Sequence, residues 1–423
     1  MSCMLSSLRY LPKAMFADSK GWMTMNKKIY MMVSSYFPTL KEPWRCAFIY
    51  DLVKAIQKTG RYEVIVVKPN IGYSYNFRGI KVIGFKSLTS GGWVCPWLWG
   101  WINSRRMFRA LESEKVDVKR IAIAHGHLVP MATFVNALSK KISGVNKVLQ
   151  FHDADPYGML FGTGTLGWLK KIMWFIYHRA QVAEMDLLVG ISNNVARVVK
   201  EAPHQQVFNT YEPMKDAMRK LRCFKPARIS RIYTLHNGVD KKIFNDTNRS
   251  THDGFVIGCV AVFRDVKDQL SLLQAVNMIK GQIPKLLVRL VGVHHSGTML
   301  DDCQRYINEN NLSVEIIPSI EHECLPDFYK SLDLFVLPSY FEGLGCVFTE
   351  AWNCGTPFIT CEGQGMDDYI YPKDRELWLC KEHNPEDLAA KILYFSKNRP
   401  TQRLSAETDI DILVPKFLDK FEQ

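Results

Sequence analysis

Short apolar runs alternate with helical patterns along the first half of the chain. Phe48 to Thr59 repeats apolar side chains at helical spacing and stops at Gly60, a residue that often follows a last helical turn. Ser192 and Asn193 suit the cap of a further helix. The expected strands are Ile29 to Ser34, Tyr62 to Val67, Ile121 to Ala124, Lys147 to Phe151 and Leu187 to Ile191.

The second half alternates more regularly. Its strand candidates are Phe255 to Val262, Leu286 to Val291, Val314 to Ile317, Leu334 to Leu337 and Pro357 to Thr360. Helical patterns lie between them at Lys267 to Met278, Met299 to Asn308, Leu325 to Ser331 and Cys346 to Asn353. This alternation indicates parallel sheets covered on both faces. We therefore expect two doubly wound α/β domains with a cleft between them, where ligands bind at the carboxyl ends of strands.

The change between the halves falls near residue 235, where a basic and irregular stretch ends. The expected units are an N-terminal domain at 25–235, a C-terminal domain at 236–400 and a final segment at 401–423 with a helix over Ile412 to Phe421. Residues 1–24 lack the apolar core and cleavage site of a secretion signal. We interpret them as an extension that is non-native or disordered, with Met23 or Met25 as the biological start. A short amphipathic anchor is the alternative.

Charge is distributed unevenly between the two halves. The first 235 residues hold 35 Lys and Arg against 14 Asp and Glu, a net charge of +21, and the remainder holds 19 against 28, or −9, within a total of +12. Such asymmetry favours an anionic partner for the first half, either a membrane surface or nucleic acid. The eleven cysteines form no CxxC pair and no cluster with zinc-site spacing, which favours reduced thiols in the cytoplasm.

The segment from Leu337 to Gly345 and on to Glu350 carries the strongest chemical signal. A strand ends at Pro338, a glycine-bearing turn follows, and a helix opens near Cys346. Glycine lets backbone amides approach a ligand closely, and a helix N-terminus attracts anions. Two carboxylates beside such an anion site suit the hydroxyl groups of a ribose and of a sugar.

This segment resembles the signature of glycosyltransferase family 4, in which Glu342 and Glu350 form the spaced glutamate pair. The resemblance implies the GT-B fold, with two facing Rossmann-like domains, and a retaining enzyme that needs no metal and no cofactor besides its nucleotide-sugar substrate. It implies that Glu350 binds the ribose hydroxyls and Glu342 the transferred sugar. The residues that would hold the donor around them are Lys267, Arg264, Gly343, Leu344, Gly345, Cys346 and Gly365.

Further segments follow the order of that family. His236 to Asp240 resembles the Asn-Gly-Val-Asp turn that opens the C-terminal domain. Lys267 resembles the lysine that contacts the donor phosphates, and the resemblance gives it, Glu342 and His152 the catalytic roles. The chain departs from the pattern at Val262, where the family has an arginine, and Arg264 either replaces that charge or is merely exposed.

The N-terminal half matches less closely. The resemblance places His152 at the reacting sugar and His127, Arg45 and Asp155 on the acceptor side, while a structural role for His127 is the alternative. Cys46 stands where related sequences have glycine.

Two other motifs favour different chemistry. Gly162 to Gly167 fits the GxGxxG dinucleotide fingerprint, although no strand precedes it. Asp153 to Asp155 fits the DxD metal motif of another glycosyltransferase fold, which the pair Glu342 and Glu350 argues against.

Aromatic and basic residues alternate in two N-terminal stretches, the first with Trp97, Trp99 and Trp101 before Arg105 and the second around Trp174. Such stretches suit a membrane interface, and core aromatics beside a solvated basic face are the alternative. The resulting hypothesis is a hexosyltransferase that moves a sugar, with UDP the expected nucleotide, to a lipid-linked glycan or surface polysaccharide. It would work at the inner face of the cytoplasmic membrane and bind no nucleic acid. A non-catalytic GT-B-like scaffold or a basic-surface binding protein is the alternative.

Overall fold

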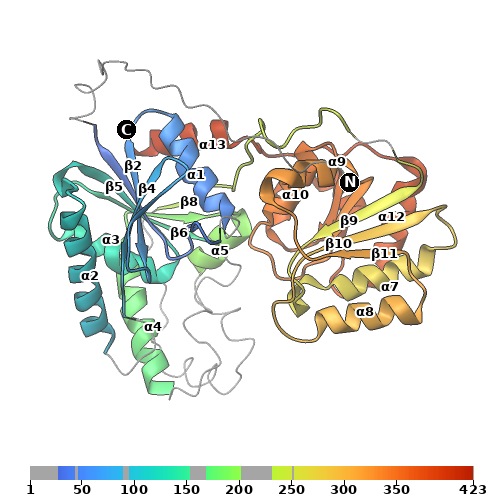
Figure 1. Cartoon of the computed structure of the whole chain (residues 1–423), viewed down its shortest axis with the longest axis horizontal. Helices are drawn as coiled ribbons and strands as arrows, with labels where there is room; N and C mark the ends of the chain where they lie inside the picture. Colours follow the sequence, from blue (N-terminus) through green and yellow to red (C-terminus); the bar gives the residue numbers. More distant parts are fainter. Residues whose placement is uncertain are drawn as a thin grey trace, which may run out of the picture.

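The computed structural model describes residues 27–42, 46–88, 95–152, 168–201, 231–249 and 252–422. Within them, two sheets lie side by side, each covered by helices on both faces (Figure 1). Their strands pair in parallel except for the edge strand β3, which is antiparallel to β4. This is the doubly wound α/β architecture that the alternating pattern predicts. The extension at 1–24, the acceptor-side residues Arg45 and Asp155, and both competing motifs in 153–167 lie outside the described residues.

The N-terminal sheet has the strand order β3-β4-β2-β1-β5-β6-β7-β8. All five residues of its central strand β1 are buried, as expected for a parallel strand covered on both faces. The strands are β1 (Ile29–Val33), β2 (Glu63–Pro69), β3 (Tyr75–Phe77), β4 (Ile80–Phe85), β5 (Ile121–His127), β6 (Asn146–Phe151), β7 (Leu187–Gly190) and β8 (Ile232–Thr234). Strand β5 is longer than its apolar run predicts, because His125 and His127 continue it as buried strand residues rather than loop.

Helices cover the N-terminal sheet in two layers. One face packs against α2 (Pro96–Ser113), α3 (Ala132–Ser139) and α4 (Trp168–Ala183), and the other against α1 (Ala47–Lys58). Helix α1 buries Ile49, Leu52, Val53 and Ile56, which is the spacing of one helical face. A further helix, α5 (Asn193–Glu201), follows β7. Ser192 caps it as expected, because its hydroxyl accepts a hydrogen bond from the Val195 amide at 3.1 Å.

The C-terminal sheet has the order β11-β10-β9-β12-β13-β14. Its strands are β9 (Phe255–Val260), β10 (Leu286–Val291), β11 (Val314–Ile317), β12 (Leu334–Leu337), β13 (Phe358–Cys361) and β14 (Leu379–Cys380). The helices around it are α7 (Gln269–Ile279), α8 (Met299–Glu309), α9 (Leu325–Lys330), α10 (Cys346–Asn353), α11 (Arg375–Trp378) and α12 (Pro385–Asn398). Consecutive strands extend outward in opposite directions from β9 and β12, and this switch point is where such sheets bind ligands.

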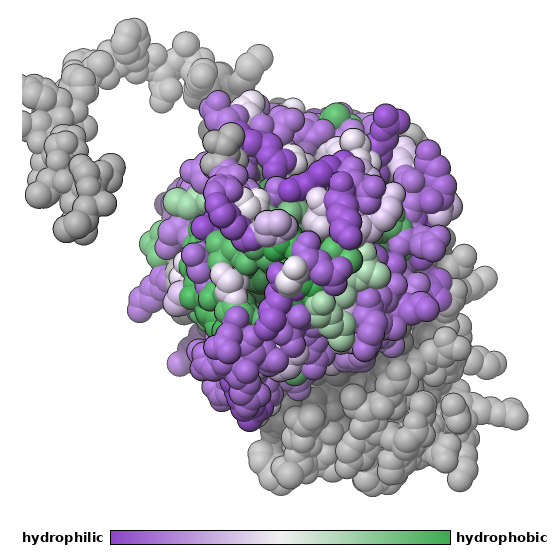
Figure 2. All heavy atoms as spheres, turned by 90° about the vertical axis from the view of Figure 1, so that its right-hand side faces the viewer, coloured by the Kyte–Doolittle hydropathy of each residue, from purple (hydrophilic) through white to green (hydrophobic). Residues whose placement is uncertain are grey.

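The far end of the C-terminal domain is mostly hydrophilic. Apolar side chains gather in the middle of that face (Figure 2). Figure 1 places the edge strand β11 at this end, and Val314, Ile316 and Ile317 of that strand are only partly buried.

The last helix, α13 (Ile410–Leu418), returns to the N-terminal domain and lies beside α1 (Figure 1). The C-terminal segment therefore packs against the N-terminal domain. Phe417 is fully buried there, with its ring 5.9 Å from that of His125 and 5.8 Å from that of Tyr233. Lys58 of α1 adds ion pairs to Asp240 at 3.1 Å and to Asp411 at 3.2 Å.

Because Phe417 fills the core between α13 and the N-terminal sheet, Phe417→Ala is expected to lower the free energy of unfolding by about 3–5 kcal/mol. Ile412→Ala is the matched control, because Ile412 lies on the same helix but is 41% exposed. Urea denaturation of both variants measures the difference. Equal destabilisation by the two substitutions would contradict this packing.

Candidate active site at the ends of β9 and β12

The turn that follows β12 is held in shape by close backbone contacts. Gly345 has a positive φ of 81° and precedes the first residue of α10. No side chain caps this helix, so its first backbone N–H groups face the turn as an anion site. Glu342 is fixed beside it, because its backbone amide donates to the Gln364 side chain at 2.8 Å.

Lys267 lies at the end of the neighbouring strand and meets Glu342. The short 3-10 helix η4 (Asp265–Lys267) follows β9 and carries Lys267 to this point. The Lys267 ammonium group forms an ion pair with the Glu342 carboxylate, and the two side chains are only 19% and 17% exposed. The switch point of the sheet thus brings together two residues that lie 75 positions apart in sequence.

Glu350 occupies the next turn inward on α10. The hydroxyl of Tyr329, on α9, donates to its carboxylate at 2.8 Å. Burial raises the pKa of Glu350 to about 7, the hydrogen bond from Tyr329 opposes that rise, and the Asp51 carboxylate on α1 adds to it. Asp51 belongs to the other domain, so Glu350 faces the N-terminal domain rather than open solvent.

The N-terminal domain reaches the same turn through His152 and Ser192. A Cβ added at Gly343 would lie 2.1 Å from the backbone oxygen of His152, so this contact requires glycine. Ser192 donates its hydroxyl hydrogen to the Gly343 carbonyl at 2.7 Å. Gly365 packs equally closely against Gly343, from the segment that follows β13.

Histidine side chains form a row behind the turn, in which His125 and His127 are buried and His152 is partly buried. Nδ1 of His127 lies 2.7 Å from Nε2 of His152, and the two rings stack. Nδ1 of His125 lies 2.6 Å from the hydroxyl of Tyr30. Burial lowers the pKa of His125 and of His152 to about 3 and holds that of His127 well below its ordinary value, so all three are neutral at physiological pH.

The structure places the site residues predicted from the sequence in different surroundings. Lys267, Glu342, Gly343, Leu344, Gly345, Cys346, Glu350, Gly365 and His152 gather around the turn after β12 or in direct contact with it. His127 is buried behind His152, where it contacts that side chain. Arg264 is exposed and makes no ion pair among the described residues.

Sequence patterns miss several residues of the site. Ser192 reads only as a helix cap, Tyr329 as an ordinary core aromatic and Asp51 as one charge on the polar side of α1. Asp368 is also missed, although its carboxylate accepts from the Asn193 amide at 2.5 Å and pairs with His236 at 2.9 Å. Each of these contacts joins segments that are distant in sequence, so no local motif announces them.

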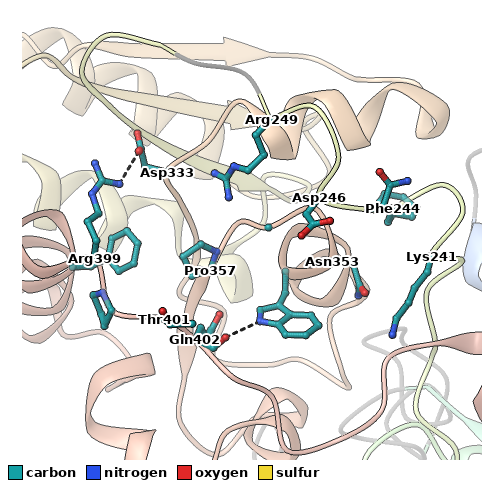
Figure 3. Close-up of a pocket in the computed structure, with 15 residues that line it drawn as sticks. Lys241, Phe244, Asp246, Arg249, Asp333, Asn353, Pro357, Arg399, Thr401 and Gln402 are labelled. Atoms are coloured by element: carbon teal, nitrogen blue, oxygen red, sulfur yellow. Dashed lines mark hydrogen bonds and ion pairs between the residues drawn. The ribbon is translucent and has the colours of Figure 1, made fainter.

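A separate cavity of about 590 Å³ lies at the other end of α10 (Figure 3). Trp352 and Asn353 line it, together with Arg249, Arg399 and Gln402. Trp352 lies seven residues beyond Gly345, which is about 10 Å along a helix. The cavity is therefore distinct from the turn that holds Glu342.

Part of the sequence matches the model of a known protein family. Residues 240–408 match the family model described as glycosyl transferases group 1. The match includes Lys267, Glu342 and Glu350, so the turn after β12 lies inside the region that is similar to this family.

Over the aligned segments, about a quarter of the positions are identical between the chain and its curated relatives. D-inositol 3-phosphate glycosyltransferase 2 of Catenulispora acidiphila is 25% identical over 59% of this chain and 65% of the relative. Sulfoquinovosyl transferase SQD2 of Arabidopsis thaliana is 25% identical over 86% and 67%. CapM of Staphylococcus aureus, a capsular polysaccharide biosynthesis glycosyltransferase, is 24% identical over 62% and 73%. The chain thus spans about two thirds of the length of these relatives.

Solved structures show that the whole chain has the GT-B fold. Sucrose-phosphate synthase from Thermosynechococcus elongatus superposes with a TM-score of 0.66 at 15% identity, over 94% of this chain and 99% of that one. Anabaena HepE, solved in complex with UDP and glucose, gives 0.64 at 12% identity, over 94% and 100%. The region that matches the family model therefore lies in the second domain of a two-domain GT-B fold.

Because the pKa of Glu350 is raised to about 7, the native state holds an extra proton between the ordinary glutamate pKa near 4.5 and pH 7. Stability from this group is therefore fully present at low pH and is lost as pH rises through 7. Glu350→Gln is expected to raise the melting temperature relative to the wild type progressively over this window.

Thermal unfolding at a series of pH values measures that difference. Glu309→Gln, at an exposed position on α8, is the control for removing one carboxylate. A difference for Glu350→Gln that stays constant from pH 4.5 to 8 would contradict the assignment.

Proposed function

We propose that this protein is a retaining glycosyltransferase that takes a hexose from a nucleotide diphosphate donor without a metal ion. The observation that carries this proposal is the ion pair between Lys267 and Glu342 beside the uncapped N-terminus of α10. At the switch point of the sheet, one lysine and the free helix amides suit a diphosphate, and two carboxylates suit sugar hydroxyls.

Each part of the donor is assigned to particular residues of this turn. The backbone amides that open α10 and the Lys267 ammonium would hold the diphosphate, which would compete with Glu342 for that lysine. Glu350 would accept hydrogen bonds from the ribose hydroxyls, and Glu342 would bind the sugar. UDP is the proposed nucleotide, in keeping with the UDP named for the structural relative HepE.

The reaction needs no covalent intermediate on the protein. The bond from the sugar C1 to the diphosphate oxygen breaks, the bond from C1 to the acceptor oxygen forms, and the acceptor hydroxyl proton passes to the departing diphosphate. Negative charge develops on that diphosphate, where Lys267 and the amides of α10 stabilise it. His152 enters from the N-terminal domain as a neutral group that binds the sugar or the acceptor hydroxyl.

The acceptor is assigned to the N-terminal domain. A lipid-linked glycan or a surface polysaccharide is proposed, because one relative is named for capsular polysaccharide biosynthesis and the first half of the chain is strongly basic. Work at the inner face of the cytoplasmic membrane follows from that acceptor. Among the described helices, none is long and apolar enough to cross a membrane.

Lys267→Ala and Glu342→Gln are each expected to lower kcat/KM at least about 100-fold, because both remove groups from the charged centre of the transition state. Hydrolysis or transfer of a radiolabelled UDP-sugar panel measures this. Lys391→Ala is the matched control, because Lys391 forms a half-buried pair with Asp387 at 2.9 Å on α12 of the same domain.

Addition of EDTA is expected to leave the rate unchanged. Full activity in both site variants would remove these assignments. Nucleotide-sugar binding without any turnover would favour the alternative of a non-catalytic scaffold, for which the valine at position 262 is the supporting feature.

A further inference from the structure

A cavity opens on the outer side of the helices α2, α3 and α4, in the N-terminal domain. It measures about 590 Å³. Its lining comes from all three helices: Trp97, Gly100, Trp101, Ser104, Arg105, Phe108, Arg109, Glu112, Thr133, Asn136, Ala137, Lys140, Lys141, Tyr177 and Gln181. Nothing in the proposed transfer reaction uses this surface.

The floor of the cavity offers a buried hydrogen-bond acceptor. Asn136 is 1% exposed, and its amide nitrogen donates to the backbone oxygen of Gln181 at 2.9 Å and to its side-chain oxygen at 3.0 Å. The Oδ1 atom of Asn136 has no hydrogen-bond partner among the described residues. A buried acceptor left unpaired costs stability, so a ligand hydroxyl that reached it would bind favourably.

Cations dominate the rim of the cavity. Arg105, Arg109, Lys140 and Lys141 line it against a single carboxylate, Glu112. Arg109 and Lys140 form no ion pair with any described residue. The other two cations lie over aromatic rings, Arg105 at 4.4 Å from the Trp101 ring centre and Lys141 at 3.9 Å from that of Phe108. This arrangement suits a phosphate group.

Large apolar side chains surround the cationic rim. On α2, Trp97 is 53% exposed, Leu98 49% and Trp101 56%, and on α4, Met173 is 40% exposed and Ile176 42%. By contrast, Trp99 and Trp174 are buried in the core, so the sequence stretch divides into core and surface aromatics. Exposed tryptophans beside lysines and arginines are typical of surfaces that lie in a bilayer interface.

We infer that α2, α3 and α4 dock on an anionic lipid bilayer, with the phosphate of a hydroxyl-bearing lipid headgroup in this cavity. The cations bind the phosphate, Asn136 accepts a hydrogen bond from a headgroup hydroxyl, and the tryptophans enter the interface. The inference rests on the proposed membrane location but not on catalysis, since binding to vesicles needs no donor.

Vesicle co-sedimentation of the full chain tests this inference. The probes are vesicles of phosphatidylcholine alone and of phosphatidylcholine with phosphatidylglycerol in equal parts. We expect binding to the second only, and about 20–30-fold weaker partitioning for Lys140→Ala with Lys141→Ala, because each charge near an anionic surface contributes about fivefold. Trp97→Ala with Trp101→Ala is expected to weaken binding even at high salt, where charge is screened.

Lys280→Ala with Lys397→Ala is the matched control, because it removes the same charge from exposed positions on the C-terminal domain. Equal binding by control and cavity variants would overturn the inference, as would equal binding to both vesicles. Displacement by soluble glycerol phosphate alone, or tighter binding to single-stranded RNA than to vesicles, would also overturn it. UDP binding measured by calorimetry separates the two proposals: vesicle binding without UDP binding leaves this inference standing while the donor site fails.

Discussion

The geometry of the site depends on one close contact between the two domains. The Gly343 backbone packs directly on the His152 carbonyl, and Ser192 donates to the Gly343 carbonyl at 2.7 Å. Any side chain at position 343 would force these backbones apart. This contact joins the carboxyl ends of two separate sheets, so a group held by one domain faces groups supplied by the other.

Burial then sets the charge of each group around that contact. Lys267 and Glu342 neutralise each other at the switch point, with little exposure of either side chain. Glu350 forms no ion pair with a described residue, and burial raises its pKa to about 7. The three histidines behind the turn are buried or partly buried as well, but the effect is reversed, because desolvation favours the neutral form of both residue types. Among the described residues, Lys267 and the α10 amides are the positive groups at this turn.

The two halves of the chain differ in what they present to their surroundings. The C-terminal half has a net negative charge but places Lys267 and the free amides of α10 at one turn. The N-terminal half spreads positive charge over its outer helices, where Lys140 and Arg109 lie beside exposed tryptophans. Under the two proposals, the donor would bind on the negatively charged half and the anionic surface would contact the positively charged half.

The sequence by itself determined the two-sheet architecture and the turn with its glutamates. The apolar runs that form β10 and β12, and the glycine turn before α10, are local features of the sequence. Burial of side chains favours the strands, and the backbone freedom of glycine allows the turn. The helical pattern over Ile412 to Phe421 overlaps α13, which lies beside α1 in the structure. The resemblance to glycosyltransferase family 4 pointed to Glu342, Glu350, Lys267 and His152, and their roles stay predictions.

Only the tertiary structure decided which of these groups meet. Lys267 pairs with Glu342 because β9 and β12 are neighbours in the sheet, and Asp51 acts on Glu350 because two domains face each other. The loop-like sequence pattern around His127 could not show the surroundings of this side chain. His127 is buried against His152 because β5 pairs with β6 in the sheet. Likewise, the sequence could not tell the buried Trp99 from the exposed Trp101, because helix packing alone decides which side of α2 faces the core.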